Sequence, residues 1–213
     1  MNFYELTKRL IDVFGAVVGI VLFSPIMLVT AICIKFVSPE GPVLADIPER
    51  VGKGGKTFRM YKFRSMIPNA HQWLLDHPDM YEKYKANNYK WDSDSDPRLI
   101  KGGKFIRNFS IDELPQFFNV LRGEMSLVGP RAYYPFEIAD QTKKFNIDKS
   151  VVAQVLTVKP GLTGVWQISG RSLVNFVDRI KIDALYAKKR SLVYDLCIIF
   201  KTPYVVLTKK GVV

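Results

Sequence analysis

VFGAVVGIVLFSPIMLVTAICI, residues 13–34, is the stretch from which the architecture of this chain follows. Its 22 residues carry no charge. A continuous helix of that length would reach about 33 Å, enough to cross a hydrocarbon core of about 30 Å. Ser24 and Pro25 stand near its middle. Pro25 frees the carbonyl four residues before it, and in lipid that carbonyl needs a partner such as the Ser24 hydroxyl. The stretch therefore predicts membrane contact and a helix broken at Ser24 and Pro25.

Basic residues flank this apolar stretch on both sides. Lys8 and Arg9 precede it, and Lys35 follows it. Because cytoplasmic flanks collect lysine and arginine, two basic flanks favour a re-entrant segment, in which two half-helices return the chain to the face it entered from. An ordinary kinked span stays open as an alternative. A cleaved signal peptide is a third reading, but residues 37–39 make a poor cleavage site.

Composition limits the nature of the remaining chain. Of 213 residues, 48% are hydrophobic and 24% charged, which is enough for one globular domain beyond the apolar stretch. The net charge of +11 is compatible with nucleic acid, anionic lipid or a phosphorylated substrate. The basic residues are spread along the chain, which argues against nucleic acid as a partner. Cys33 and Cys197 lie among apolar residues, so we expect two buried thiols and no disulfide.

Turn residues divide the sequence into short elements. We expect strands at 42–45, 57–63 and 126–128, turns and strand at 160–171, and a basic amphipathic stretch around 101–109. Helices are expected at 69–90, from near Asp112 to Arg122, in a region between 130 and 160, and in two pieces of 173–209 divided at Pro203. The predicted fold class is α/β, mainly helical and of the α+β kind, with a small sheet. Residues 1–37 are expected to form a re-entrant helical hairpin, and residues 38–213 one cytoplasmic domain with amphipathic helices on the membrane surface.

The segment SIDELPQFFNVLRGEMSLVGPR, residues 110–131, contains the candidate site. Asp112 and Glu113 form an adjacent carboxylate pair at the predicted start of a helix. By local physics alone they are helix caps, because acidic groups there accept free N–H groups and complement the helix dipole. Ser110 with Glu113 also spells a capping box. The further cues at matching spacing around the pair favour a functional role.

Those cues resemble the bacterial sugar transferase family, the monotopic phosphoglycosyl transferases that act on polyprenyl phosphate. The resemblance covers almost the whole chain. It is carried by KRLIDVFGA at 8–16, the Ser24-Pro25 break, MYKFRSM at 60–66, DPRLIKGGKFIRNFSIDELPQFFNVLRGEMSLVGPR at 96–131, and PGLTGVWQISGR at 160–171. So many matches in order are typical of common ancestry.

The resemblance implies a catalytic domain that transfers a sugar 1-phosphate from a UDP-sugar to undecaprenyl phosphate and releases UMP, an early step of exopolysaccharide, capsule or O-antigen assembly. It implies that Asp112 attacks the phosphorus next to the sugar and forms a covalent intermediate. Glu113, with Asp112, would hold Mg²⁺. Arg131 would clamp phosphate oxygens. The enzyme would act at the cytoplasmic face of the bacterial inner membrane.

Further candidate phosphate-binding residues rest on local patterns. Lys62 and Arg64 alternate with aromatic residues, so one strand could direct two cations toward phosphates or toward a membrane surface. In and beside the glycine-punctuated segment 160–171, the candidates for nucleotide binding are Lys159, Thr163, Gln167 and Arg171. The glycines there could instead serve only tight turns.

The sugar and the assembly state follow less directly. The polar stretch 69–91 and the spelling of TGVWQISGR look more like hexose 1-phosphate transferases, which favours UDP-galactose or UDP-glucose and leaves an N-acetylated sugar open. Those relatives usually carry additional membrane helices and a soluble domain, and a homodimer stays open for this chain. The alternative class is a basic membrane-anchored binding module without catalysis. Such a module would not need Asp112, Glu113 and Arg131 together.

Overall fold

The computed structural model of the chain describes residues 3–86, 91, 95–170 and 173–208. Its helices are α1 (Phe3–Val37), α2 (Ala70–Leu75), α3 (Pro78–Ala86), α4 (Gly103–Asn108), α5 (Gln116–Arg122), α6 (Pro135–Lys144), α7 (Lys149–Val155), α8 (Val165–Ile168), α9 (Phe176–Lys189) and α10 (Leu192–Leu207). Its strands are β1 (Arg50–Val51), β2 (Thr57–Phe58), β3 (Ser126–Val128) and β4 (Gly161–Thr163), with short 3-10 turns η1 (Lys53–Gly55) and η2 (Ile111–Glu113). The mainly helical fold with little sheet is confirmed.

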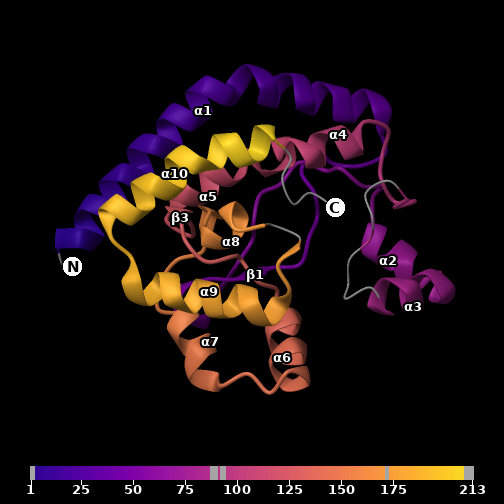
Figure 1. The fold of residues 1–213 in the computed structure, drawn as a ribbon. Helices are drawn as coiled ribbons and strands as arrows, with labels where there is room; N and C mark the ends of the chain where they lie inside the picture. Colours follow the sequence, from indigo (N-terminus) through magenta and orange to yellow (C-terminus); the bar gives the residue numbers. More distant parts are fainter. Residues whose placement is uncertain (1–2, 87–90, 92–94, 171–172, 209–213) are drawn as a thin grey trace.

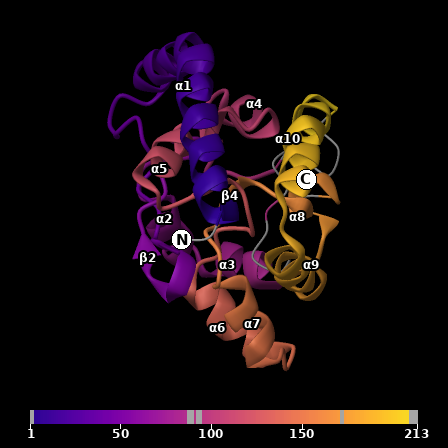
Figure 2. The ribbon, with the colours of Figure 1, turned by 90° about the vertical axis from the view of Figure 1, so that its left-hand side faces the viewer.

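The apolar stretch forms part of α1, which continues as one helix through Pro25. Within the described part of the chain, α1 is the one helix long and apolar enough to cross a membrane. Figures 1 and 2 show that it bends as it passes over the other elements. Proline residues inside helices commonly cause such bends, and Pro25 lies inside α1. The Ser24 hydroxyl donates to the Val21 carbonyl at 2.9 Å, the group that Pro25 leaves free, so the expected partner is confirmed.

A buried carboxylate anchors the N-terminal part of α1. Asp12 Oδ1 accepts hydrogen bonds from Lys8 Nζ at 3.0 Å, Ser126 Oγ at 2.9 Å and the Leu127 N–H at 3.0 Å. The last two donors belong to β3. Arg9 donates to the last carbonyls of α5 at 2.6 and 2.7 Å, where the free carbonyls of a helix end attract a cation. These contacts hold the start of α1 against β3 and α5.

The C-terminal end of α1 is anchored as well. Arg64 is buried and donates to the Pro42 carbonyl at 2.6 Å and to Ser38 Oγ at 2.6 Å, which ties down the loop that follows the helix. Ile34 is buried in a cluster with Phe63. The helix ends at Val37, where the predicted domain boundary falls. Both ends of α1 therefore contact the part of the chain that follows it.

The strands form two small sheets. β1 pairs antiparallel with β2, and β3 pairs parallel with β4, with Ser126 opposite Gly161. The strands expected at 42–45 and 57–63 are reduced to β2 and a single bridge between Leu44 and Phe63. A Cβ atom on Gly161 would lie 2.1 Å from the backbone nitrogen of Gly129. Glycine is thus required where the loop after β3 crosses β4.

The expected helix start at Asp112 is wrong. Asp112 and Glu113 lie in η2, and α5 begins only at Gln116, after Pro115. Ser110 has a positive φ of 55° and its side chain makes no capping hydrogen bond, so the capping box is wrong too. An N-cap residue needs extended backbone, which the turn before η2 does not allow at Ser110. The predicted helix end is confirmed, because Gly123 takes the left-handed conformation with φ 79°.

Two expectations for the C-terminal region and the thiols are also wrong. The C-terminal helices divide after Lys189, and the Ser191 side chain accepts from the Tyr194 N–H at the start of α10. Pro203 lies inside α10 rather than at the break. Cys33 and Cys197 are free but exposed, because each lies on a helix with an outward apolar face. Apolar sequence neighbours alone do not indicate burial in a chain of this kind.

Candidate active site

Asp112 and Glu113 lie beside Lys62. The Lys62 Nζ atom is 2.7 Å from Asp112 Oδ2 and 3.7 Å from Glu113 Oε1. Asp112 is only 2% exposed, whereas Glu113 and Lys62 reach the surface. A buried carboxylate without a partner would be strongly destabilising, and the Lys62 ammonium offsets that cost. The site thus contains one buried, ion-paired carboxylate and one that stays accessible.

Contacts from η2 and α5 position the segment that carries Lys62. The Phe63 N–H donates to the Asp112 carbonyl at 2.9 Å. The fully buried Asn119 of α5 accepts from the Tyr61 N–H at 2.8 Å and donates to the Arg59 carbonyl at 2.8 Å. The predicted helix contained Asn119 between apolar residues, and that pattern is a signal for a buried polar contact that the functional reading overlooked.

The carboxylate pair fits a magnesium ion that is shared with a substrate. Across the residues that the structure describes, no three His, Cys, Asp or Glu side chains come together as a metal site. Mg²⁺ is commonly held by one or two carboxylates, with substrate phosphates and water as its other ligands. Asp112 and Glu113 supply that number of carboxylates. A dedicated all-protein metal cage is not what these residues offer.

Arg131 lies in the loop after β3. Its guanidinium carbon is 5.2 Å from the centre of the Trp166 ring, and its backbone N–H donates to Asp183 Oδ2 at 3.0 Å. Burial is the largest single influence on the pKa of Arg131 and would lower it, but the combined charges of Glu137, Tyr133, Tyr134 and Glu113 raise it. Arg131 therefore shares its electrostatic surroundings with the carboxylate pair.

Two further arginines, Arg50 of β1 and Arg179 of α9, approach the same loop. Arg50 Nη1 donates to the Ala132 carbonyl at 2.9 Å, and Arg179 Nη2 lies 3.6 Å from a Glu137 oxygen. Burial and repulsion from Arg131 lower the pKa of Arg50 to about 10. Neither arginine was predicted, because a single basic residue in a short strand or on a polar helix carries no sequence signal of burial.

Three other predicted ligands lie elsewhere or point inward. Arg64 is used by the loop after α1, as described above. Thr163 Oγ1 is 2.7 Å from Thr202 Oγ1 of α10. Gln167 is buried, and its Oε1 atom has no hydrogen-bond partner among the described residues. The geometry gives Arg64 and Thr163 structural contacts, and a substrate role for Gln167 stays a prediction.

Of the remaining two candidates, the structure describes Lys159, which is not joined to the carboxylate pair. Lys159 Nζ lies 3.4 Å from the position of a Cβ atom on Gly123, at the C-terminal end of α5. Burial and the nearby Arg9 lower the pKa of Lys159. Asp112 precedes the other end of α5, so Lys159 stands away from it. Arg171 lies outside the described residues.

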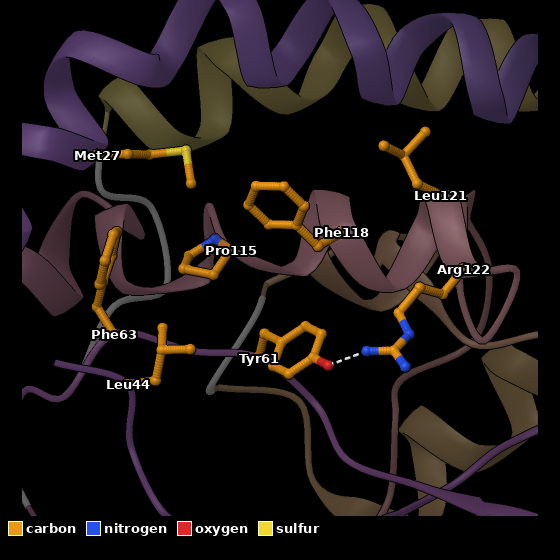
Figure 3. Close-up of a pocket in the computed structure, with 8 residues that line it drawn as sticks. All are labelled: Met27, Leu44, Tyr61, Phe63, Pro115, Phe118, Leu121 and Arg122. Carbon is orange, nitrogen blue, oxygen red and sulfur yellow. Dashed lines mark hydrogen bonds between the residues drawn. The ribbon is translucent and has the colours of Figure 1, made fainter. Parts of the chain in front are cut away.

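An apolar groove opens beside the carboxylate pair, between α1, α5 and the segment before α2 (Figure 3). Its volume is about 670 Å³. The residues that line it are Met27, Leu44, Tyr61, Phe63, Pro115, Phe118, Leu121 and Arg122. Figure 3 shows Met27, Phe118 and Leu121 on the helices above Tyr61 and Leu44, with a hydrogen bond between Tyr61 and Arg122 at one end. Pro115 and Phe63 connect the groove to the backbone around Asp112.

Several known proteins are similar to this chain in sequence. The undecaprenyl-phosphate galactose phosphotransferase of Salmonella typhimurium is 38% identical over 208 residues, 96% of this chain and 41% of that protein. The UDP-N-acetylgalactosamine-undecaprenyl-phosphate N-acetylgalactosaminephosphotransferase of Aeromonas hydrophila is 41% identical over 211 residues, 98% of this chain and 45% of that protein. The chain thus spans less than half the length of these relatives.

A third relative is closer in length. The exopolysaccharide production protein ExoY of Rhizobium meliloti is 38% identical over 210 residues, which cover 97% of this chain and 88% of that protein. The family model described as bacterial sugar transferase matches residues 3–209. With nearly every residue inside that match, from the start of α1 to the end of α10, this chain belongs to the bacterial sugar transferase family.

Proposed function

We propose that this protein transfers a sugar 1-phosphate from a UDP-sugar to polyprenyl phosphate, releases UMP, and thereby begins the membrane assembly of a polysaccharide. The observation that carries the proposal is the buried Asp112 carboxylate, ion-paired with Lys62 and adjacent to an apolar groove. A fixed anionic nucleophile beside a lipid-sized groove suits a reaction between a water-soluble donor and a lipid acceptor. The relatives from Salmonella typhimurium and Aeromonas hydrophila are named for undecaprenyl phosphate, which supports the same acceptor here.

The first chemical step begins with Asp112. Its carboxylate oxygen forms a bond to the phosphorus that carries the sugar, and the bond from that phosphorus to the bridging oxygen breaks. The electron pair remains on the bridging oxygen, which leaves with UMP. Lys62 fixes the orientation of the carboxylate before the donor arrives. Arg131 holds phosphate oxygens through its planar donors.

The second step regenerates the carboxylate. An oxygen of polyprenyl phosphate attacks the same phosphorus, and the bond to Asp112 breaks with its electron pair returning to the carboxylate. No proton has to be transferred in either step. Mg²⁺, held by Glu113 and Asp112, would neutralise the donor diphosphate when bound. The chain itself gives the two carboxylates different environments: Asp112 is buried and positioned for attack, and Glu113 stays accessible.

The groove is the proposed site for the first isoprene units of the acceptor. Its walls are almost entirely apolar, and Met27 belongs to the helix that we place in the bilayer. Burial of hydrocarbon contributes about 0.8 kcal/mol per CH₂ group, so a few isoprene units suffice to hold the acceptor. Pro115 lines the groove close to Asp112 in the chain, which would bring the acceptor phosphate next to the nucleophile.

The contacts of α1 support a re-entrant topology. Asp12 near its start and Ile34 near its end are both buried against the domain formed by the later chain. A straight span would carry those two ends to opposite faces of the bilayer. We therefore propose that α1 dips into the bilayer and returns, with the domain on the cytoplasmic face of the inner membrane, where UDP-sugars are found.

A second membrane contact is proposed for α10. Its exposed apolar side chains recur at helical spacing and are Val193, Leu196, Phe200, Tyr204 and Leu207. Such a stripe suits a helix that lies in the headgroup layer. A homodimer remains a prediction. Cys197 is exposed between Leu196 and Phe200 of this stripe, so its crosslinking can test whether two copies meet there. Oxidative crosslinking in membranes would join two copies through Cys197 only if these stripes face one another.

The assay that tests the proposed reaction measures the released nucleotide. Detergent-solubilised protein is incubated with polyprenyl phosphate, Mg²⁺ and one UDP-sugar at a time, including UDP-galactose, UDP-glucose and UDP-N-acetylgalactosamine. The expected product is UMP, formed only when both substrates are present over repeated turnovers. UDP instead of UMP would identify an ordinary glycosyltransferase and contradict the proposal. The same panel names the sugar, which relatives with galactose and N-acetylgalactosamine in their names leave undecided.

A further inference from the structure

Three arginines from distant parts of the sequence surround the loop 131–134. Arg131 belongs to the loop itself. The guanidinium carbon of Arg50 lies 3.3 Å from the centre of the Tyr134 ring, and that of Arg179 lies 5.9 Å from the centre of the Tyr133 ring. β1, the loop after β3, and α9 thus bring three cations to one place.

The three side chains share an unusual feature. Each has a buried Nε atom without a hydrogen-bond partner among the described residues. Arg50 and Arg179 are each only 6% exposed. Buried polar groups in native proteins are overwhelmingly paired, and a buried donor left without a partner costs about 1–3 kcal/mol. Three such donors in one cluster indicate a ligand that brings acceptors.

The acidic groups nearby do not balance the cluster. Within the described part of the chain, Glu137 supplies the carboxylate within 4 Å of these guanidiniums, at 3.6 Å from Arg179. Asp183 uses one oxygen for a backbone N–H and a tyrosine hydroxyl, and burial raises its pKa to about 7. Glu113 raises the pKa of both Arg50 and Arg131, so the cluster lies within electrostatic reach of the carboxylate pair. Uncompensated buried cations are costly, and an anionic ligand would relieve that cost.

We propose that Arg50 and Arg179, together with Arg131, bind the α-phosphate of the donor nucleotide, the phosphate that leaves as UMP. The inference rests on the proposed function. When Asp112 attacks the phosphorus next to the sugar, the electron pair of the broken bond stays on the α-phosphate, which gains one negative charge. Guanidinium donors that are already fixed in position stabilise this developing charge, so they bind the α-phosphate more strongly in the transition state than in the ground state.

Glu137 is the internal competitor in this site. Its Oε1 atom faces Arg179, and its charge acts on Arg131 and Arg50 as well. A phosphate that enters the cluster adds negative charge beside that carboxylate. Neutralising Glu137 should therefore strengthen phosphate binding, whereas removing either arginine should weaken it. Two opposite effects from one cluster distinguish an anion site from a structural one.

The test measures binding of UMP and of uridine to the detergent-solubilised full chain by calorimetry. For Arg50→Gln and Arg179→Gln the Kd of UMP should rise about tenfold or more, while the Kd of uridine changes little. Glu137→Gln should lower the Kd of UMP. Arg59→Gln is the matched control, because the Arg59 side chain is exposed and its ion pair with the exposed Asp46, at 3.8 Å, lies at the surface. Melting temperatures establish that each variant is folded.

The outcomes separate this inference from the proposed reaction. Folded Arg50→Gln and Arg179→Gln variants with an unchanged Kd of UMP would overturn the inference, even if the parent releases UMP from a UDP-sugar. Absence of UMP binding by the parent would overturn it too. If UMP binding depends on both arginines but no UDP-sugar yields UMP, the inference stands and the proposed reaction fails. Should a glutamine variant unfold, Arg50→Lys and Arg179→Lys decide, since they keep the charge and lose the planar fork.

Discussion

A carboxylate that acts as a nucleophile must stay ionised even when it is buried. At Asp112 the Lys62 ammonium lies 2.7 Å from the carboxylate and pairs with it, and the hydrogen bond from the Phe63 N–H to the Asp112 carbonyl fixes the backbone. Glu113 is more exposed and its contact with Lys62 is longer, at 3.7 Å. These differences in burial and pairing suit two adjacent acidic residues to different parts in the proposed reaction.

Replacement of Asp112 by asparagine should reduce turnover to background. The change keeps the shape of the side chain and removes the anionic oxygen that forms the covalent bond. Loss of an essential nucleophile commonly lowers kcat by several orders of magnitude. UMP release over time is the measurement, with melting temperature as the control for folding. Retention of more than about a tenth of the parent rate would exclude Asp112 as the nucleophile.

Asp183 gives the protein a pH-dependent stability. Burial raises its pKa from 3.8 to about 7 in the folded state, against the opposing effect of hydrogen bonds from Arg131 and Tyr133. Between those two values the folded state binds more protons than the unfolded state. The free energy of unfolding therefore falls as pH rises from about 4 to about 7, by a few kcal/mol at most.

Asp183→Asn should remove that slope. Asparagine cannot titrate, and its carbonyl can still accept from the Arg131 N–H and the Tyr133 hydroxyl. Melting temperature in detergent should therefore be higher for the variant than for the parent at pH 7.5, and the difference should shrink toward pH 5. Asp178→Asn, a change at a more exposed residue of the same helix, is the control. Parallel curves for parent and variant across this range would contradict the raised pKa.

At the level of single residues, the sequence nominated candidates where they stand in short motifs. The Asp112–Glu113 pair and Arg131 could be named from one continuous segment, and Lys62 from an alternating strand-like pattern. Arg50 and Arg179 could not, because their meeting point is created by tertiary contacts between β1, the loop after β3, and α9. Burial of an arginine is a property of its neighbours in space, which a single sequence does not display.

At the scale of elements, α1 shows how a proline can be accommodated in lipid. Ser24 donates to the Val21 carbonyl at 2.9 Å, so the bend leaves no unpaired acceptor at that point. The sequence predicted the partner correctly but predicted two half-helices instead of one bent helix. The reason is that loss of one hydrogen bond bends a helix without ending it when a side chain replaces the missing donor.

A double-mutant cycle at this bend should show strong coupling. Ser24→Ala leaves the Val21 carbonyl unpaired and should cost about 1–3 kcal/mol of stability in the parent. In a Pro25→Leu background the leucine N–H bonds that carbonyl, and Ser24→Ala should then be nearly neutral. Unfolding in detergent measures both effects. Equal costs in the two backgrounds would refute the proposed replacement of the helical hydrogen bond.

The start of α5 was misplaced for a related reason. Pro115 suits the first turn of a helix, and the sequence assigned Asp112 to the cap in front of it. In the structure Ser110 and η2 turn the chain first, and that turn directs the Asp112 side chain to Lys62. At a candidate functional site the backbone often departs from regular secondary structure. Patterns in the sequence predict the ends of helices least well at such places.

The groove beside α5 predicts a selective effect on the acceptor. Phe118→Ala removes part of the apolar wall and should raise the KM for polyprenyl phosphate several-fold, while the KM for the UDP-sugar stays close to the parent value. Phe118 is partly exposed, so folding should tolerate the change. Phe136→Ala on α6 removes an equally large exposed ring away from the groove and serves as the control. Equal changes in both KM values would place the acceptor elsewhere.

At the scale of the whole molecule, apolar exposure is concentrated on one side. α1 carries the outward-facing side chains Val17, Val18, Val21, Leu22, Leu28, Val29 and Ile32. The start of α10 is joined to the start of α1, where the Tyr4 hydroxyl donates to Asp195 at 3.2 Å, and Figure 1 shows α6 with α7 at the end of the molecule opposite α1. α6 ends with Lys143 and Lys144 in its last turn. This polarity supports the proposed placement of α1 toward lipid, with α6 and α7 toward water.

The overall architecture was predictable in kind but not in detail. The apolar stretch and the punctuation by glycine and proline indicated one long apolar helical segment and a mainly helical chain, and both are present in the described residues. The contact between Arg9 of α1 and Val120 of α5 joins residues more than a hundred positions apart. The pairing of β3 with β4 joins residues more than thirty positions apart. Contacts at that separation follow from the folded topology and leave no local pattern in a single sequence.

The topology of α1 can be decided by labelling its N-terminal end. Phe3 is exposed at the start of the helix, and the two native thiols are exposed as well, so Phe3→Cys must be made in a Cys33→Ser, Cys197→Ser background. The anchors at Asp12 and Arg64 hold both ends of α1 to one domain, and labelling should therefore require a reagent that reaches the cytoplasm. Labelling from outside intact spheroplasts by an impermeant reagent would establish a full span.

A single cysteine at Phe136→Cys on α6 is the matched control for the cytoplasmic side, since the exposed Phe136 ring lies on the domain itself. Protection of both sites from outside, with labelling of both in inverted vesicles, is the pattern that a helix entering and leaving by the same face must give.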